Sequence, residues 1–352
     1  MRKGLLASAL LALSTACAAP APSPRPSLPQ EGRADPAASA TPSGVTALDL
    51  GIVVYDLGVT ETAQLFHIAD QVSAWSPFSH KQYARWVERE HLLGPTETNA
   101  LAAHRALRRR LHYGVLDQTF YTARSIDDAL TATALDPADV ETERALFRAM
   151  TPVVLPLLAR ERQHVLDVRD AIVAQRDTLT SMLTDLASFS EVYMAKEHVP
   201  VWLIATTDPA NGGGGYNGGQ MVLEAGRSAV HVLMHESLHL VLGRRKEMLA
   251  AAARGCGDGL DEMTLEEGIA YALYPGIVGE PGSIPRDLAR FAEAGMTADQ
   301  PYVRFNRLGL ALTPIVEKAL TGKTKLTALL PEACTAYQRL RKEPWPPPAA
   351  SH

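Results

Sequence analysis

Residues 229–242 have the sequence A-V-H-V-L-M-H-E-S-L-H-L-V-L, and this stretch decides the fold around it. Apolar residues occupy nearly every side of a helix drawn through it, which predicts a buried helix that ends at Gly243. The helix contains an H-E-x-x-H motif made of His235, Glu236 and His239. Residues four apart share one helical face, so both imidazoles can reach one metal ion.

The H-E-x-x-H motif predicts a hydrolytic site with one Zn²⁺ per chain. A buried helix that carries two histidines and a glutamate needs partners for all three, and a metal ion supplies them. Zinc with an open coordination position lowers the pKa of a bound water to about 7. Glu236 projects away from the two ligands, which suits it to accept the proton of that water as a general base.

A hydrolytic zinc ion needs a third protein ligand, and the sequence offers several downstream carboxylates. A second short helix is predicted from about Thr264 to Tyr274, ending at Pro275, and it contains Glu266 and Glu267. Asp258 and Asp261 lie closer to the H-E-x-x-H motif, so an aspartate is an alternative third ligand.

Glu267 also has a purely structural interpretation. Thr264-x-x-Glu267 matches a capping box, in which the glutamate side chain returns to the start of the helix. Glu266 would then be the ligand. Gly268 favours Glu267, because a missing side chain would let this helix approach the H-E-x-x-H helix closely. We therefore expect Glu267 as the third ligand, with the other carboxylates as alternatives.

Together, H-E-x-x-H at residues 235–239 and E-G-x-A at residues 267–270 resemble the gluzincin zinc metallopeptidases. The resemblance covers about residues 198–275. It implies that Glu267 binds zinc beside His235 and His239, that the substrate is a peptide or protein, and that a small twisted sheet covers the H-E-x-x-H helix. In such enzymes the strand before that helix pairs with the extended substrate, and by resemblance this strand would be residues 220–224.

The rest of the chain predicts an α+β fold. Residues 46–190 are expected to be mostly helical, with Thr96 capping one helix and Asp136 and Pro137 beginning another. Pro152 and Pro156 are expected to interrupt the helical pattern.

Residues 191–342 are expected to form the zincin-like part. Residues 198–207 and 220–224 predict strands, and the glycine-rich stretch 211–219 predicts a loop between them. A further helix is expected around residues 305–320, and residues 343–352 are rich in proline and predict a disordered tail.

The N-terminus predicts export. Arg2 and Lys3 precede a ten-residue apolar run that is too short to span a bilayer permanently. Small residues and Cys17 follow, which looks like a bacterial lipoprotein signal in which this cysteine is lipidated. Residues 18–45, rich in Pro, Ala and Ser, predict a disordered tether. We therefore expect an extracytoplasmic protein anchored to the bacterial membrane by its lipid, in the outer membrane if the cell has one.

Export leaves two further cysteines, Cys256 and Cys334, which could pair in an oxidising compartment. Two buried free thiols are the alternative. The remaining histidines, such as His67 and His104, are expected to be ordinary surface or core residues.

Composition and glycine spacing argue against other ligands. The chain of 352 residues has 34 basic and 39 acidic side chains and a net charge of −5, which gives no reason to expect nucleic acid as a partner. Residues 213–218 match the dinucleotide glycine fingerprint, but the predicted strand that follows cannot provide the required helix N-terminus. We therefore expect no nucleotide.

The leading hypothesis is a zinc metallopeptidase of the cell envelope. A non-catalytic envelope lipoprotein with a structural zinc site is the first alternative. A zinc amidase or esterase that acts on a non-peptide substrate is the second, because the chemistry at the metal is the same. A peptidase also needs a donor for the developing oxyanion. The candidates are Tyr271, Tyr274, His231 and Tyr216, and a packed core position remains the favoured interpretation of Tyr271.

Overall fold

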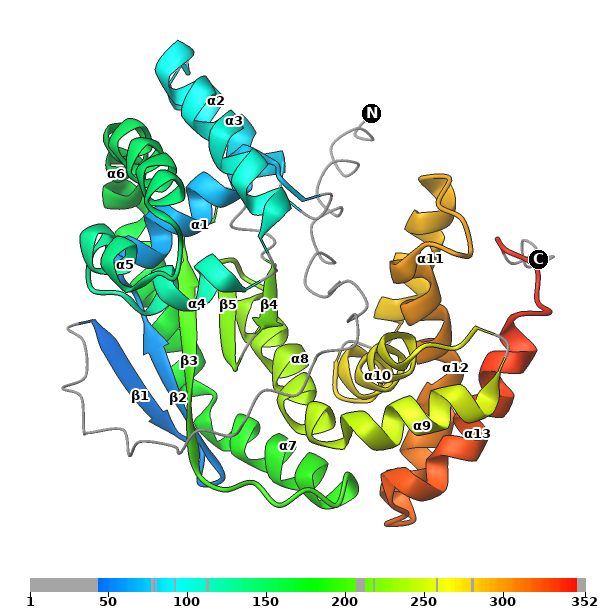
Figure 1. Cartoon of the computed structure of the whole chain (residues 1–352). Helices are drawn as coiled ribbons and strands as arrows, with labels where there is room; N and C mark the ends of the chain where they lie inside the picture. The colour runs from blue at the N-terminus through cyan, green and yellow to red at the C-terminus, as the bar shows by residue number, and fades with distance from the viewer. Residues whose placement is uncertain are drawn as a thin grey trace, which may run out of the picture. The chain divides into compact units, whose positions relative to one another are not determined.

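The structure is a computed structural model that describes residues 44–346, apart from residues 77–78, 80, 92, 112–113, 207–212, 218, 258 and 280–281. These residues form a mixed α and β fold, as predicted (Figure 1). The signal segment, Cys17 and nearly all of the tether lie outside the described residues. Among the helices that are described, none has the length and hydropathy needed to cross a membrane.

Five strands form one sheet in the order β1-β2-β3-β5-β4. Their bounds are Val45–Asp49 (β1), Val53–Gly58 (β2), Glu197–Ile204 (β3), Gly214–Asn217 (β4) and Gln220–Glu224 (β5). The two strands predicted near residues 198–207 and 220–224 are confirmed as β3 and β5. Sequence analysis missed β1 and β2, and it assigned the residues of β4 to a loop.

The pairing of β5 contradicts one prediction. β5 runs parallel to β3, with Val201 opposite Met221, and antiparallel to β4, with Tyr216 opposite Met221. A strand with neighbours on both sides has no free hydrogen-bonding edge for an extended substrate. The prediction that β5 pairs with substrate is therefore wrong, and the edge strand on this side of the sheet is β4.

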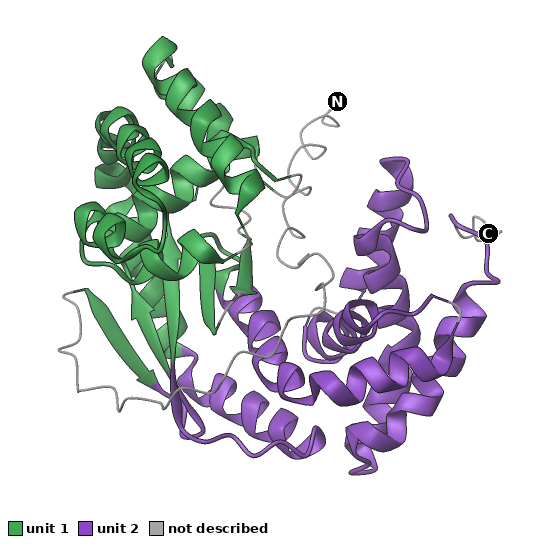
Figure 2. Cartoon of the chain, viewed as in Figure 1, with its two compact units in different colours: residues 1–48, 55–174, 199–229 green, residues 49–54, 175–198, 230–352 purple. Residues whose placement is uncertain are grey.

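The chain divides into two compact units (Figure 2). Unit 1 contains Tyr55–Ala174 and Val199–Ala229, together with the chain before Asp49. Unit 2 contains Asp49–Val54, Gln175–His198 and Val230–His352. Each unit is therefore built from segments that are distant in the sequence, and each has its own buried core.

Unit 1 combines most of the sheet with helices α1 to α6. Their bounds are Glu61–Ser73 (α1), Lys81–Glu90 (α2), Pro95–Arg110 (α3), Val115–Thr122 (α4), Ile126–Ala132 (α5) and Pro137–Ala174 (α6). Phe120 stacks between Phe66 and Phe147, with ring centroids 4.9 and 5.0 Å away, and this aromatic stack joins α1, α4 and α6. Helix α3 begins two residues earlier than predicted, with Gly94 rather than Thr96 at its N-cap.

Helix α6 is continuous at Pro152 and Pro156, so the expected break in the helical pattern is wrong there. The helix begins at Pro137, and the Asp136 side chain accepts a hydrogen bond from the Asp139 amide as predicted. It then continues through Pro152 and Pro156 to Ala174. Both prolines lie on the exposed face of α6. The carbonyl groups that lose their helical donors there can bond to water, while the opposite face buries valine and leucine side chains.

Unit 2 is mostly helical. Its elements are Arg176–Phe189 (α7), Ala229–Leu242 (α8), Gly243–Arg245 (η1), Lys246–Cys256 (α9), Glu262–Tyr271 (α10), Ala272–Ile277 (η2), Ser283–Glu293 (α11), Pro301–Thr321 (α12) and Leu326–Leu340 (α13). The H-E-x-x-H helix is α8, as predicted. Gly243 is predicted to terminate the helical segment. Instead it begins a 3₁₀ turn that leads into α9.

Helices α10 and α12 pack against each other at two glycines. A Cβ atom on Gly268 would lie 2.6 Å from the Leu308 side chain, and one on Gly309 would lie 2.5 Å from the Tyr271 Cβ. The missing side chains therefore set the approach of these two helices. This corrects the expectation that Gly268 serves an approach to the H-E-x-x-H helix.

Two contacts tie down the C-terminal part of unit 2. The structure joins Cys256 at the end of α9 to Cys334 in α13 by a disulfide. After α13, the Trp345 indole donates a hydrogen bond to the Met296 carbonyl at 2.7 Å, and the Arg307 guanidinium lies 5.5 Å from the Trp345 ring centroid. The first residues of the predicted disordered tail are therefore held against the helices.

Candidate metal centre

Three predicted ligands converge in unit 2. His235 and His239 lie one turn apart on α8, and Glu267 lies on α10. The two histidine Nε2 atoms are 3.2 Å apart, and each lies 3.5 or 3.6 Å from a carboxylate oxygen of Glu267. Ligand atoms about 2.1 Å from a tetrahedral metal ion are about 3.4 Å from one another. The group can therefore hold a metal ion without a change of backbone.

The alternatives to Glu267 lie elsewhere. The Glu266 carboxylate is 2.9 Å from His239 Nδ1, on the side of the ring that faces away from the converging Nε2 atoms. Asp261 is the N-cap of α10, where it accepts a hydrogen bond from the Thr264 amide and pairs with Arg304. Because Asp261 holds the cap, the capping box predicted for Thr264 and Glu267 is wrong. Asp258 lies outside the described residues.

Both histidines are held in the tautomer that a metal ion requires. His239 Nδ1 donates to the Glu266 carboxylate, and His235 Nδ1 lies 3.3 Å from the Tyr274 carbonyl oxygen. A carboxylate and a carbonyl only accept hydrogen bonds, so one ring proton resides on Nδ1, and a metal ion at the shared point would take the place of any proton on Nε2. Metal-binding histidines in proteins almost always have such an outer acceptor.

The charges of the site favour a cation. Burial alone would lower the pKa of His239, but the surrounding carboxylates of Glu267, Glu266 and Glu236 raise it to about 10. Glu236 and Glu267 are themselves 1% and 3% exposed. A buried group with this excess of carboxylates needs compensating positive charge, which a proton on His239 or a metal ion can supply.

Glu236 stands apart from the three ligands. It lies in α8 beside His235, is almost completely buried and is close enough to raise the pKa of His239. It does not belong to the group of converging ligand atoms. Its role as a general base stays a prediction.

The accessible side of the centre is the side of His235. Its side chain is 15% exposed, compared with 7% for His239 and 4% for Glu267. The Tyr271 ring lies against His235, with centroids 5.0 Å apart, and the His231 ring lies 5.7 Å from that of Tyr274. Three of the candidate oxyanion donors therefore line this side, while Tyr216 belongs to unit 1.

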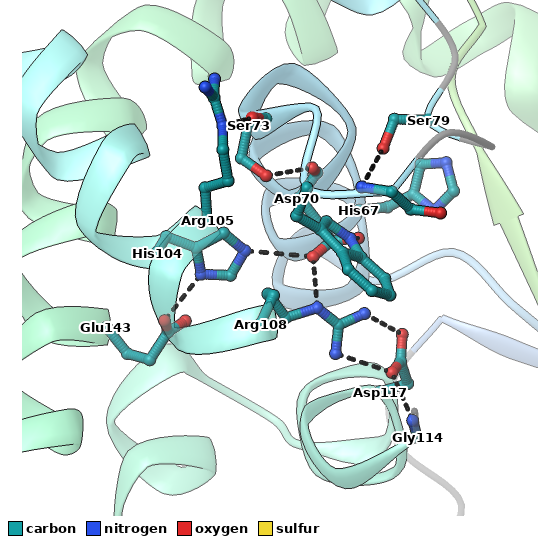
Figure 3. A network of polar contacts seen from close by, with 12 residues as sticks. His67, Asp70, Ser73, Ser79, His104, Arg105, Arg108, Gly114, Asp117 and Glu143 are labelled. Atoms are coloured by element: carbon teal, nitrogen blue, oxygen red, sulfur yellow. Dashed lines mark hydrogen bonds and ion pairs between the residues drawn. The ribbon is translucent and has the colours of Figure 1, made fainter. Parts of the chain in front are cut away.

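A second buried polar cluster lies in unit 1, and sequence analysis missed it (Figure 3). His104, expected to be an ordinary residue, is completely buried, with Nδ1 2.6 Å from Glu143 Oε1 and Nε2 3.0 Å from Asp70 Oδ1. The Arg108 Nε lies 2.8 Å from the same Asp70 oxygen, and its two terminal nitrogens bind Asp117. Both nitrogens of His104 are thus occupied by carboxylates, so this histidine cannot serve as a base towards a substrate.

No family model, curated protein or solved structure matches the chain. The resemblance to gluzincins therefore stays a prediction that rests on the two motifs.

Proposed function

We propose that the chain is a zinc-dependent hydrolase of the gluzincin type that cleaves peptide bonds. The observation that carries the proposal is the convergence of His235 Nε2, His239 Nε2 and the Glu267 carboxylate, with a second buried acid, Glu236, in the same helix as the histidines. Two imidazole nitrogens and one carboxylate are a donor set typical of catalytic zinc, which keeps a further position for water or substrate.

Each residue then has a defined task. His235, His239 and Glu267 would hold the zinc ion, and the hydrogen-bond partners of the two Nδ1 atoms would keep the rings oriented. The bound ion would supply a Lewis acid that polarises the scissile carbonyl and makes water acidic. Glu236 would take the proton of the attacking water and pass it to the leaving amine.

The burial of Glu236 supports an enzyme over a structural zinc site. A purely structural site is closed by its ligands and has no use for an additional buried acid beside the metal. A carboxylate that is 1% exposed carries a cost of desolvation, which a catalytic role explains.

The test compares Glu236→Gln with the wild type, with Glu247→Gln in the exposed first turn of α9 as a matched control. Zinc content is measured by elemental analysis, and turnover is measured with a broad library of fluorogenic peptides. We expect Glu236→Gln to keep its zinc and to lose turnover by about 10² to 10⁴-fold. The control should match the wild type.

Other outcomes would lead elsewhere. A zinc-loaded wild type that cleaves no peptide but hydrolyses amide or ester substrates would point to the amidase or esterase alternative. A wild type that binds zinc and turns over none of these substrates would favour a structural site in an envelope lipoprotein.

A further inference from the structure

The two histidines of the metal centre are held by different kinds of structure. His239 is held by a side chain, the Glu266 carboxylate, within the regular part of α10. His235 is held by the main chain, through the Tyr274 carbonyl in the π turn η2 that follows α10. η2 is irregular at this residue, because Tyr274 leaves the helical conformation with φ −139° and ψ 121°.

We propose that the π turn Ala272–Ile277 is the positioning element for His235, and that the Tyr274 carbonyl is its hydrogen-bond acceptor. The proposal rests on the metal-binding part of the proposed function and not on hydrolysis. The chain leaves the helical conformation at Tyr274, and the carbonyl oxygen of this residue lies 3.3 Å from His235 Nδ1.

His235 needs such support more than His239 does. Its side chain is about twice as exposed, at 15% against 7%, so burial restrains its ring less. Tyr271 covers one side of the ring at a centroid distance of 5.0 Å and an interplanar angle of 62°. Tyr271 lies one turn after Glu267 on α10, so the same helical face supplies a metal ligand and a wall for His235. The Tyr274 carbonyl then restrains the rotation of the His235 ring that Tyr271 leaves possible.

Glycine at position 276 makes this arrangement possible. A Cβ atom on Gly276 would lie 2.9 Å from the Tyr271 carbonyl oxygen and 2.8 Å from Thr313 Oγ1 of α12. The hydroxyl could rotate away, but the carbonyl belongs to the backbone of the helix that carries Glu267. An alanine at this position must therefore displace η2, and the Tyr274 carbonyl moves with it.

The decisive variant is Gly276→Ala in the full chain. Gly255→Ala is the matched control, because it adds the same methyl group inside α9 where no atom lies within 4 Å. Zinc affinity is measured by competition with a chromophoric chelator, and the geometry of the site by the visible spectrum of the cobalt-substituted protein. Circular dichroism checks that both variants are folded.

We expect Gly276→Ala to bind zinc about 10 to 100-fold more weakly than the wild type, with a changed cobalt spectrum. Gly255→Ala should bind as the wild type does. A folded Gly276→Ala protein that binds zinc as tightly as the control would overturn the positioning role while leaving the proposed hydrolase intact. A wild type that binds no zinc would overturn both.

A second measurement covers the case in which Gly276→Ala does not fold. Nitrogen-15 spectra of the zinc-loaded wild type report which ring nitrogen of each histidine carries the proton. The proposal requires zinc on Nε2 and a hydrogen-bonded proton on Nδ1 of His235. Zinc on Nδ1, or an Nδ1 proton that exchanges with water as fast as that of an exposed histidine, would refute it.

Discussion

Replacing His104 with glutamine should destabilise unit 1 and remove most of its sensitivity to alkaline pH. His104 lies in α3 between the Asp70 carboxylate of α1 and the Glu143 carboxylate of α6 (Figure 3). Both carboxylates need a donor, so both ring nitrogens must carry protons and the ring must be positively charged. A neutral ring would turn a nitrogen lone pair towards one of the two carboxylate oxygens and lose that hydrogen bond.

The size of the effect follows from the pKa of His104. Burial lowers this pKa, but the contacts with Asp70 and Glu143 outweigh burial and raise it from 6.5 to about 9. At about 1.4 kcal/mol per pH unit, the protonated ring stabilises the folded state by about 3 kcal/mol. Because the folded pKa is raised, this stabilisation is complete below pH 6.5 and is lost as the pH rises to about 9.

Asp70 determines the pH below which the same network stops stabilising the fold. Burial raises its pKa, but Arg108 and His104 reverse this effect and lower it from 3.8 to about 2. Its contribution is therefore present above pH 3.8 and is lost only as the pH falls towards 2. The network should stabilise unit 1 most between about pH 4 and 6.5.

Urea unfolding at about pH 6 and about pH 9 measures the effect. Tryptophan fluorescence is a suitable signal, because Arg108 of the network lies 4.3 Å from the Trp75 ring centroid. His91→Gln, at an exposed histidine of unit 1, is the matched control. The wild type and the control should lose about 3 kcal/mol between the two pH values, and His104→Gln should be less stable at pH 6 and nearly independent of pH. An equal alkaline loss in all three proteins would refute the charged state of His104.

Three further predictions concern unit 2. Replacing both cysteines of the disulfide by serine should lower the free energy of unfolding by about 4 kcal/mol in urea titrations, because the bond closes a loop with a sequence separation of 78. Glu266→Gln should keep zinc with an affinity reduced about 10-fold, whereas Glu267→Ala should lose it, and equal losses in a chelator competition would contradict the assigned roles. Gly268→Ala should cost about 1 to 3 kcal/mol, because its Cβ would lie 2.6 Å from the Leu308 side chain, while Gly243→Ala, with open space around it, should be nearly neutral in thermal unfolding.

The sequence predicts the H-E-x-x-H helix better than its surroundings, for physical reasons. Helix α8 is long and apolar, and its two histidines repeat at the helical period, so element and site follow from one pattern. The choice between Glu266 and Glu267 depends on where α10 begins. The cap is Asp261 rather than Thr264, and neighbouring residues of a helix point about 100° apart. The Glu267 side chain therefore faces the Nε2 atoms of the two histidines, and the Glu266 side chain faces Nδ1 of His239.

Other parts of the structure could not be predicted from local sequence patterns, because they depend on contacts between distant residues. The short strands β1 and β2 follow a segment rich in Pro, Ala and Ser, and they pair as neighbours in the sheet. Helix α6 continues through two prolines because both face water, while the opposite side of the helix is buried. The His104 cluster joins residues from α1, α3, α4 and α6, and their spacing in the sequence gives no sign of it.

The bond between α9 and α13 has a practical consequence for every measurement on the metal centre. Helix α9 follows directly from the helix that carries both histidine ligands, and α13 packs on α12, which in turn packs on the helix of Glu267. Protein produced in a reducing bacterial cytosol would lack this cross-link. Weak zinc binding by such material would then reflect the production host rather than the ligands, so the protein should be secreted or refolded under oxidising conditions before its metal content is judged.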